Sequence, residues 1–391
     1  MKILMIHPHD IRSPHEPWTI RIVSLIREFR DKGHQVKLAY CPLRINERKR
    51  NVDLQGIEII HLSRSAGLKS LLNNIRTLKK ASEWADIIHV QKCFHYASIP
   101  ALVASCIQNK PLHYDWDDWE EKIWYHSNKR SLHRLIFGIF LKLLERWLPV
   151  AADTVSVSSD KLKELCLRFG VEKERIFKAP VGADLKKFSP RISGDWVRKK
   201  HNLGNKEVIL YLGQLHGGQY VRMFIEAANI VLHDYPNTAF LIVGEGYMLE
   251  RLNRLVVGLE IEEHVIFTGS IDHDKIPNYI AASDICVACF EHNDITICKS
   301  PLKVVEYLAS GKPIVASLVG EVRNMVGGAG FLVEPGNYPA LAKAIAELLG
   351  NTQLRLEMGL RAWQRAEARY NWAQTAENIS TAYSKSVRRE Q

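Results

Sequence analysis

Short apolar runs rich in β-branched residues alternate with longer amphipathic segments along the whole chain, and this alternation constrains the fold more than any other feature. A short run that is apolar throughout is typical of a strand buried on both faces of a parallel sheet. We predict such strands at 3–6, 36–40, 57–61, 87–90, 111–114, 154–157, 176–179, 208–212, 239–243, 265–267, 285–288, 314–316 and 331–333. The segments between them, such as 21–32, 221–232 and 340–349, have helical periodicity. Repeated strand–helix alternation predicts right-handed crossovers and a doubly wound α/β fold.

The length of 391 residues is about right for two domains, and a polar stretch at 186–206 offers a place for the linker. This stretch contains Pro190 and Gly194 and has no convincing strand pattern. We therefore expect one domain at 1–187, a second at 188–371, and a final helix at 372–391 that packs back on the first domain. Two such domains that face each other would form a crevice at the carboxyl ends of their strands, the default ligand site of this architecture.

Positive charge is concentrated in the first half of the chain. Residues 1–190 carry 32 lysines and arginines against 21 acidic residues, a balance of +11, whereas residues 191–391 carry 21 against 22, a balance of −1. This asymmetry suggests that the first half meets an anionic partner such as a membrane surface, or that it serves solubility. The sequence has no nucleic-acid-binding motif, so we expect no nucleic-acid partner.

Apolar runs and cysteine usage favour a cytoplasmic protein. No stretch of about 18 apolar residues is present, and the apolar run in the start MKILMIHPHD is too short for a signal peptide. The seven cysteines have no framework spacing, which favours reduced thiols. Cys286 and Cys289 form a CxxC pair inside a predicted strand, where residues three apart point to opposite faces. We interpret them as core residues rather than as a metal or redox site.

Two long segments resemble the signatures of a known family. They read ADTVSVSSDKLKELCLRFGVEKERIFKAPVGADLKKFSP at 152–190 and SPLKVVEYLASGKPIVAS at 300–317, and both are similar to the retaining glycosyltransferases of family 4. The resemblance covers nearly the whole chain and implies the GT-B fold, in which two Rossmann-like domains face each other across a crevice. It also implies a nucleotide-sugar donor in the C-terminal domain, an acceptor in the N-terminal domain, and transfer without a metal ion or a cofactor.

The motif at 300–313 is the strongest donor-site candidate. It predicts a helix that starts at Ser300 or Pro301, continues through Leu302 and Lys303, and ends at Ser310–Gly311. The N–H groups at a helix N-terminus suit a diphosphate, and a bound diphosphate would explain a cation at Lys303, in a first turn where it opposes the helix dipole. By resemblance, Glu306 binds the ribose hydroxyls.

One acidic position of the family motif is changed in this chain. The family pairs the glutamate at 306 with a second glutamate eight residues earlier, where this chain has Cys298. Glu291 or Asp294, in the loop EHNDITICK, could take over the work of the missing carboxylate on the sugar ring, or both could be solvated loop charges.

The family also places two diphosphate-binding cations at positions where this chain has Gln214 and, roughly, Gln219. Their loss would reduce stabilisation of the leaving group unless other groups replace them. Besides Lys303, the candidates near this loop are His216, Gly217, Gly218 and Arg222. The two adjacent glycines could instead form only a tight turn. Loops after the next strands complete the predicted donor site with Gly244, Gly269, Ser270 and Ile271, of which 269–271 are expected to read the nucleobase.

Two polar segments in the first half are acceptor-site candidates. The loop HPHDIRSPHEPWTIR at 7–21 follows the first strand, and we expect it to bind the acceptor through His9, Arg12, His15 and Trp18. Arg12 or Arg21 could meet an anionic acceptor, or the loop could be ordinary polar surface with Trp18 in the core.

The segment HYDWDDWEEKIWYH at 113–126 interleaves aromatic rings with carboxylates, a combination that suits a carbohydrate. We expect Trp116 and Trp119 to contact the acceptor, and Asp117 or Asp118 to bind it or to act as a base. A DxD metal site at Asp115 and Asp117 is the alternative. We expect no metal, because that motif is typical of the other major glycosyltransferase architecture.

The most apolar helix pattern, SLHRLIFGIFLKLLERW at 131–147, has two interpretations. It is either a core helix under the N-terminal sheet or an interfacial membrane helix, which the +11 balance of this half would suit.

The leading hypothesis is a retaining transferase that moves a hexose from a UDP- or GDP-linked donor to a glycan or lipid-linked acceptor, in the cytoplasm or at the inner face of the membrane. The leaving phosphate itself would help to deprotonate the acceptor, so no protein nucleophile is needed. The alternatives are an epimerase or phosphorylase on the same fold, and a non-catalytic nucleotide-sugar-binding partner of another transferase. The second alternative rests on Gln214, Gln219 and Cys298.

Overall fold

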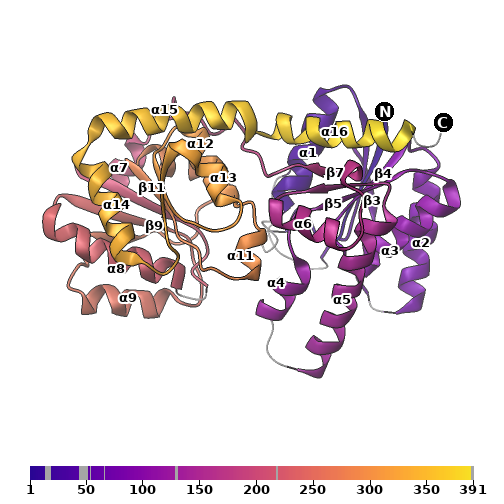
Figure 1. The fold of residues 1–391 in the computed structure, drawn as a ribbon, viewed down its shortest axis with the longest axis horizontal. Helices are drawn as coiled ribbons and strands as arrows, with labels where there is room; N and C mark the ends of the chain where they lie inside the picture. Colours follow the sequence, from indigo (N-terminus) through magenta and orange to yellow (C-terminus); the bar gives the residue numbers. More distant parts are fainter. Residues whose placement is uncertain are drawn as a thin grey trace. The chain divides into compact units, whose positions relative to one another are not determined.

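The computed structural model describes residues 1–13, 19–43, 52, 54–65, 67–127, 131–216 and 219–388. The chain forms two compact units. Unit 1 comprises Met1–Pro180, Cys298–Ser300 and Trp372–Gln391, and unit 2 comprises Val181–Ile297 and Pro301–Asn371. Each unit is a sheet covered by helices (Figure 1).

Unit 1 contains a seven-stranded parallel sheet in the order β3-β2-β1-β4-β5-β6-β7. Its strands are β1 (Lys2–His7), β2 (Gln35–Tyr40), β3 (Glu58–His61), β4 (Ile87–Gln91), β5 (Leu112–Trp116), β6 (Thr154–Val157) and β7 (Ile176–Lys178). Its helices are α1 (Ile20–Asp31), α2 (Leu68–Ser82), α3 (His95–Gln108), α4 (Glu120–Ser127), α5 (Leu132–Ala151), α6 (Asp160–Arg168), the 3₁₀ helix η2 (Lys173–Arg175) and the C-terminal α16 (Trp372–Arg388).

Unit 2 contains a six-stranded parallel sheet in the order β10-β9-β8-β11-β12-β13. Its strands are β8 (Glu207–Leu212), β9 (Thr238–Val243), β10 (Val265–Phe267), β11 (Ile285–Ala288), β12 (Ile314–Ser317) and β13 (Gly330–Val333). Its helices are α7 (Asp195–Lys200), α8 (Gln219–Asp234), α9 (Leu249–Gly258), α10 (Ile276–Ala281), α11 (Asp294–Cys298), α12 (Leu302–Ala309), α13 (Val322–Val326), α14 (Tyr338–Gly350) and α15 (Thr352–Arg369), with short 3₁₀ helices η3 (His273–Lys275) and η4 (Gly327–Ala329).

The predicted doubly wound α/β class is confirmed in both units. Every predicted strand is present, within two residues of its predicted bounds at each end. In each sheet the order reverses beside the first strand of the unit, β1 or β8, as a doubly wound topology requires. Cys286 packs on one face of the unit 2 sheet and Cys289 on the other, as the strand periodicity predicts, and burial raises the pKa of each thiol to about 12.

The division between the units lies at Pro180–Val181, seven residues before the end predicted for the first domain. The polar stretch at 186–206 is part of unit 2, because three apolar side chains in it, Phe188, Val197 and Leu203, are buried in the unit 2 core. The stretch also forms α7, so it is not an open linker. The stretch is polar in composition, but its few apolar side chains pack into the unit 2 core.

The interior of unit 1 holds a buried ion pair. The guanidinium of Arg21, on α1, donates to both carboxylate oxygens of Asp115, on β5, at 2.7 Å each, and to the carbonyl of Ala179 at 3.0 Å. Burial opposes ionisation of Asp115, but the charge and hydrogen bonds of Arg21 outweigh it and hold the pKa of that carboxyl well below its ordinary value. The pair therefore stays charged inside the domain.

The C-terminal helix α16 completes this polar interior. The hydroxyl of Tyr383 lies 2.7 Å from Nδ1 of His89, whose Nε2 is 3.8 Å from Asp115. Burial lowers the pKa of His89 to about 4, so the ring is neutral at pH 7. Two further contacts, the Thr375 hydroxyl to the Pro180 carbonyl and burial of Ile379 against β-strand residues, fasten the helix to unit 1.

Asp115→Asn is expected to destabilise unit 1 by about 3–5 kcal/mol, because it leaves the Arg21 guanidinium buried beside a neutral group. Urea denaturation gives the free energy of unfolding. Glu250→Gln, which breaks the exposed pair with Arg254, is the matched control and should change stability little. An Asp115→Asn variant as stable as the control would contradict the expected contribution of the Arg21–Asp115 pair to the free energy of unfolding.

Candidate active site

Three glycines end β8, β9 and β10 at the carboxyl edge of the unit 2 sheet. The N–H of Gly244 donates to the carbonyl of Gly269 at 3.0 Å, which makes an isolated antiparallel bridge between the loops. A β-carbon at Gly244 would lie 1.9 Å from the carbonyl oxygen of Gly213, so no larger residue fits there. The structure thus brings the predicted donor-site residues Gly244 and Gly269 together.

The ammonium group of Lys303 lies at the same edge. A β-carbon on Gly213 would be 2.6 Å from Lys303 Nζ, which shows how closely this amine approaches the end of β8. The Nζ atom stands 4.5 Å from the ring centroid of Tyr211 and 5.4 Å from that of Phe290. Aromatic faces attract a cation without neutralising it. Lys303 therefore brings a positive charge to the place where the sequence predicts a diphosphate.

The helix that carries Lys303 starts slightly later than predicted. Helix α12 begins at Leu302, and Pro301 is its N-cap rather than its first helical residue. Pro301 at this N-cap makes no side-chain capping hydrogen bond. At the other end, Gly311 has a φ of +64°, the left-handed conformation expected of a glycine after a helix.

Glu306 lies one turn further along α12 and is 3% exposed. Its Oε1 is 2.6 Å from Nε2 of His273, and Nδ1 of that ring is 2.9 Å from Nζ of Lys187. Since the lysine can only donate, the neutral imidazole accepts at Nδ1 and donates from Nε2 to the carboxylate. His273 was not predicted from the sequence. It joins Glu306 to η3, which follows the loop 269–271 that was expected to read the nucleobase.

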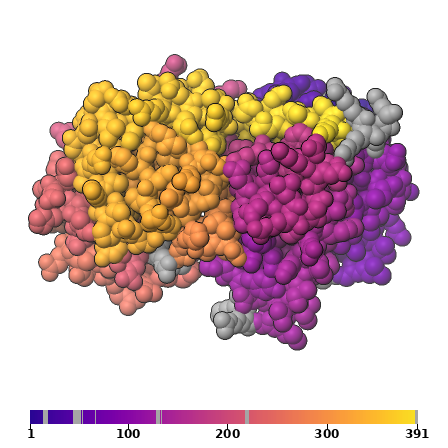
Figure 2. All heavy atoms as spheres, viewed as in Figure 1, coloured from indigo at the N-terminus to yellow at the C-terminus, as the bar shows by residue number. Residues whose placement is uncertain are grey.

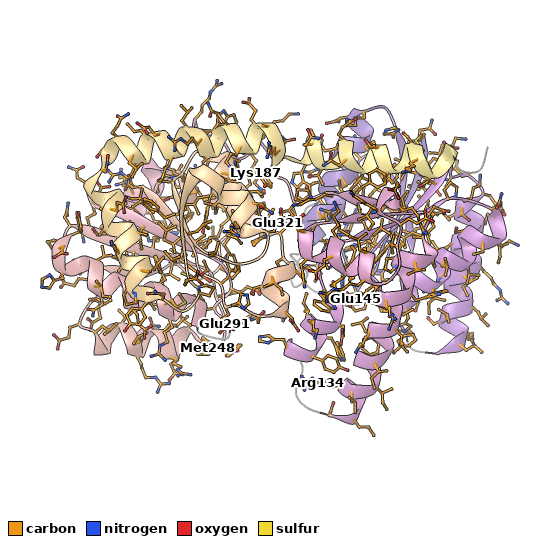
Figure 3. All side chains as sticks on the ribbon, viewed as in Figure 1. Arg134, Glu145, Lys187, Met248, Glu291 and Glu321 are labelled. Carbon is orange, nitrogen blue, oxygen red and sulfur yellow. The ribbon has the colours of Figure 1, made fainter. Side chains whose placement is uncertain are left out.

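Arg222 and Glu291 line one cavity of about 440 Å³ at the carboxyl edge of unit 2. Arg222 Nε donates to Glu226 at 2.9 Å, and Glu291 accepts from the side chain of Asn293 at 3.2 Å (Figure 3 labels Glu291). Asp294 is exposed, begins α11 and is not among the residues that line the cavity. Of the two carboxylates predicted to replace the missing glutamate, Glu291 is the one that lines a cavity and can contact a ligand there.

The other predicted donor residues differ in exposure. Gln214 and His216 are exposed, and the His216 ring stacks on Tyr247 with centroids 5.2 Å apart. Ser270 is exposed, whereas Ser300 is buried. The apolar side chains at 271 and 302 are partly buried and pack against the unit 2 core. Gly217, Gly218 and the side chain of Gln219 lie outside the described residues.

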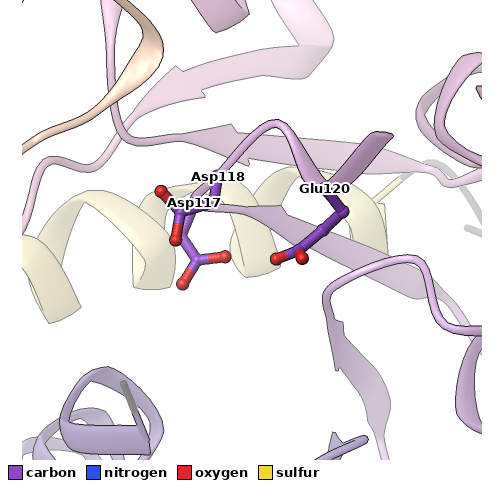
Figure 4. Close-up of side chains that lie close together, drawn as sticks. All are labelled: Asp117, Asp118 and Glu120. Atoms are coloured by element: carbon purple, nitrogen blue, oxygen red, sulfur yellow. The ribbon is translucent and has the colours of Figure 1, made fainter. Parts of the chain in front are cut away.

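The carboxyl edge of the unit 1 sheet holds three neighbouring carboxylates, those of Asp117, Asp118 and Glu120 (Figure 4), and all three lie near one buried lysine. Nζ of Lys92 lies 3.2 Å from Asp117 Oδ1 and 3.5 Å from Asp118 Oδ2, and it also contacts Glu120. Gln91 donates to the second oxygen of Asp117 at 2.7 Å. The lysine follows β4 with a φ of +65°, an uncommon conformation for a residue with a side chain. Lys92 was not predicted from the sequence, although a lysine directly after an apolar strand is a signal for this edge.

Asp117, Asp118 and Glu120 form an acidic cluster, and burial raises the pKa of two of its members, Asp117 and Glu120. Burial, helped by the negative charges of its acidic neighbours, raises the pKa of Asp117 even against the attraction of Lys92. Burial likewise raises the pKa of Glu120 to about 7. Burial would lower the pKa of Lys92, but the carboxylates outweigh it and raise that pKa well above its ordinary value. The cluster thus combines a permanent ammonium with one carboxyl group, that of Glu120, which exchanges its proton near neutral pH.

A fourth carboxylate, Glu145 on α5, fixes the backbone of the cluster. It accepts hydrogen bonds from the backbone N–H groups of Glu120 at 2.6 Å and Glu121 at 2.9 Å, where α4 begins (Figure 3 labels Glu145). It also accepts from Nε1 of Trp116 at 3.1 Å. A carboxylate is a favourable cap at a helix N-terminus.

The structure corrects the prediction for Trp116. Strand β5 continues two residues beyond its predicted end, so Trp116 belongs to the strand and is fully buried. Its ring stacks with those of Tyr114 and Phe169. It cannot contact an acceptor. Trp119, after the strand, is partly exposed and lies under the ammonium of Lys122 at 4.9 Å.

Two further expectations about charged residues are also corrected. Arg21 does not meet an acceptor, because it is buried against Asp115. The same pair excludes the DxD alternative, since both oxygens of Asp115 are bonded to Arg21. His9 is mostly buried with its ring edge-on to Phe94, and Arg12 is partly exposed. His15 and Trp18 lie outside the described residues.

Family comparisons cover both units. Residues 19–182 match the family model described as a glycosyl transferase 4-like domain, and residues 206–351 match the one described as glycosyl transferases group 1. A D-inositol 3-phosphate glycosyltransferase of Nocardia farcinica is 30% identical over 253 residues, which cover 61% of this chain and 54% of that protein. A GDP-mannose-dependent alpha-(1-6)-phosphatidylinositol monomannoside mannosyltransferase of Mycolicibacterium smegmatis is 29% identical over 198 residues, 49% of this chain and 52% of that protein. The match spans about half the length of these relatives.

Solved structures resemble the chain along nearly its whole length. Anabaena Alr3699/HepE in complex with UDP superposes with a TM-score of 0.75 at 19% identity and covers 98% of this chain and 100% of that one. Sucrose-phosphate synthase from Thermosynechococcus elongatus gives 0.70 at 21% identity, with 98% of each chain covered. At these identities the likeness concerns the fold, and it confirms the predicted GT-B class. Because the two family models together match residues in both units, the chain belongs to the group 1 glycosyltransferases, those of family 4.

Proposed function

We propose that this protein transfers a hexose, with retention of configuration, from a nucleoside-diphosphate sugar to a glycan or lipid-linked acceptor. Family membership over both units supports a transferase. The relative from M. smegmatis is named for GDP-mannose and a phosphatidylinositol mannoside, and Alr3699/HepE was solved with UDP. These names support a UDP- or GDP-linked donor. We assign the donor to unit 2 and the acceptor to unit 1.

The observation that carries the proposal is the position of Lys303. The bond from the sugar C1 to the phosphate oxygen breaks during transfer, and negative charge develops on that oxygen. Lys303, at the end of β8 and over the rings of Tyr211 and Phe290, is placed to stabilise this negative charge. The chain needs such a cation because positions 214 and 219, where the family has cations, are glutamines. The acceptor oxygen attacks C1 from the same face, and its proton passes to the leaving phosphate.

Glu306 has the second donor role in the proposal. A buried carboxylate at a helix surface can accept hydrogen bonds from the two ribose hydroxyls, each worth more than a neutral hydrogen bond. His273 already donates to one of its oxygens, which keeps the carboxylate oriented. The proposal therefore treats His273 as the positioning residue of Glu306.

The acidic cluster of unit 1 suits acceptor hydroxyls. Three carboxylates share one ammonium, so the cluster retains acceptor capacity for O–H donors. Asp117 or Asp118 can bind the acceptor hydroxyl and assist the transfer of its proton to the leaving phosphate. Lys92 supplies the positive charge that would otherwise come from a bound cation, which supports transfer without a metal ion or cofactor. The excess positive charge of residues 1–190 supports a cytoplasmic protein that binds an anionic membrane surface peripherally.

The test of the proposed function is a panel of UDP- and GDP-linked hexoses, measured for thermal shift and for release of the nucleoside diphosphate. We expect one donor to be turned over, slowly without an acceptor. A donor that binds and is never hydrolysed or transferred would favour a non-catalytic binding partner instead.

Lys303→Ala should lower kcat by about 10²–10³-fold and raise the donor KM less, because its help grows as the leaving oxygen gains charge. Gln214→Arg should raise activity or donor affinity by restoring a cation. Steady-state kinetics with the donor from the panel measure both effects. Lys343→Ala, an exposed lysine on α14, is the matched control. A near-normal kcat for Lys303→Ala would place the leaving group elsewhere.

Lys92→Met should move the acid limb of the pH–rate profile to higher pH by about 1–3 units, because a nearby cation lowers carboxylate pKa values by that much. The carboxylates work when deprotonated, so activity is present above their pKa and is lost as the pH falls through it. In the unaltered protein this loss should fall above the ordinary range of an aspartate, because burial raises the pKa of Asp117. Removing the ammonium raises that midpoint.

Lys92→Arg keeps the charge and should restore the limb toward its original position. The exposed Lys80→Met is the control for loss of a lysine in unit 1. A uniform fall in kcat at every pH, with no shift of the limb, would mean that Lys92 only supports the fold.

A further inference from the structure

Helix α5 is held by one face and presents the other to solvent. Its buried face consists of Leu141, Leu144, Leu148 and the carboxylate of Glu145. Its exposed face carries eight large apolar side chains, between 36% and 72% exposed: Leu132, Leu135, Ile136, Ile139, Phe140, Leu143, Trp147 and Val150. Their spacing of three and four residues aligns them along one side of the helix. The interpretation of 131–147 as a core helix under the sheet is therefore wrong for the exposed face of α5.

The helix is anchored firmly to its neighbour α4. The indole N–H of Trp124 donates to the carbonyl of Arg134 at 3.0 Å, and the rings of Trp124 and Phe137 are 4.6 Å apart. A β-carbon at Gly138 would lie 2.2 Å from the ring of Tyr125, so glycine is needed for this close approach. The α4–α5 pair extends beyond the rest of unit 1 (Figures 1 and 2). The exposed apolar face of α5 thus belongs to a helical hairpin, α4–α5, whose two helices are well packed against each other.

The charges on this face have one sign. Lys142 and Arg146 are exposed, one helical turn apart. The only acidic residue of α5, Glu145, is buried at the N-terminus of α4. Arg134 is partly buried and donates to the carbonyl of Tyr125. The exposed face of α5 is therefore an apolar stripe edged by cations, and the helix has no exposed carboxylate. Such a face is complementary to a surface that has anionic groups on the outside and an apolar layer below them.

We propose that the exposed face of α5 docks on the surface of an anionic phospholipid bilayer. Single exposed apolar residues are common on proteins, but a contiguous stripe of this length marks an interaction site. Apolar side chains reach the acyl region, Trp147 suits the interface, and the cations meet lipid phosphates. In the described part of the chain, no helix has the combination of length and apolar character needed to cross a bilayer. The inference rests on the peripheral location in the proposed function and names the surface and the lipid class.

A second copy of the chain is the competing occupant, and the charges disfavour it. A two-fold symmetric pairing of α5 faces would bring the same patch of each copy together. Lys142 and Arg146 would then approach their own counterparts with no exposed carboxylate of α5 to offset them. An anionic bilayer removes this repulsion.

The test is co-sedimentation of the full chain with vesicles of phosphatidylcholine alone or with about 30% phosphatidylglycerol, at low and high salt. We expect preferential binding to the anionic vesicles, weakened by salt. Ile136→Asp/Leu143→Asp should reduce binding to them by at least about 100-fold, because two apolar contacts are lost and two charges repel the lipid. Lys142→Gln/Arg146→Gln should reduce it by about 25-fold, since each cation near such a surface contributes about fivefold.

The matched control is Leu356→Asp/Leu360→Asp, two exposed leucines one turn apart on α15 of unit 2, which should bind like the unaltered chain. Circular dichroism and thermal melting check the fold of each variant. If the aspartate variant fails to fold, Ile139→Gln/Leu143→Gln replaces it, with an expected loss of about tenfold or more.

Three outcomes would overturn the inference. They are equal binding to neutral and anionic vesicles at low salt, α5 variants that bind as well as the α15 control, and a dimer in sedimentation velocity that the α5 variants dissociate while no vesicle binding is seen. Failure of the proposed function is separable. A chain that binds vesicles through α5 but turns over no nucleotide sugar contradicts only the transferase, and one that transfers sugar but ignores vesicles contradicts only this docking face.

Discussion

Parallel strands that are buried on both faces leave no room within the sheet for groups that must meet a ligand, so reactive polar groups collect where the strands end. Both units of this chain obey that constraint. In unit 2, the loops after β8, β9 and β10 meet through Gly213, Gly244 and Gly269, and Lys303 approaches the same edge. In unit 1, Lys92 follows β4 and Asp117 follows β5, and adjacent strands bring them into contact.

The two units hold a lysine at this edge in opposite ways. Lys303 lies over two aromatic rings, which attract a cation without carrying a negative charge of their own, and this arrangement suits an anion such as a diphosphate. Lys92 is surrounded by three carboxylates, so the net charge around it is negative, and this arrangement suits hydroxyl donors. The same residue type thus supports two different ligand chemistries, because its neighbours differ.

The sequence predicted what depends on neighbouring residues and missed what depends on distant ones. Strand positions follow from local apolar runs, and the place of Lys303 follows from a helix start a few residues away. Trp116 was misassigned because a strand end cannot be read closer than about two residues when polar and aromatic residues alternate. The partners of Asp115 and Asp117 lie 94 and 25 residues before them and become neighbours only through the sheet order.

Unit 1 is assembled from the two ends of the chain. The hydroxyl of Tyr383 reaches His89 in its polar interior, and Ile379 fills its apolar core, yet both come from α16, which is synthesised after unit 2. A growing chain therefore finishes unit 2 before it can close unit 1. At a synthesis rate of about 5–20 residues per second, the residues up to Pro180 wait roughly 10–40 s for α16. During that interval the part of unit 1 that α16 covers stays exposed, and of the two units the one that is begun first is completed second.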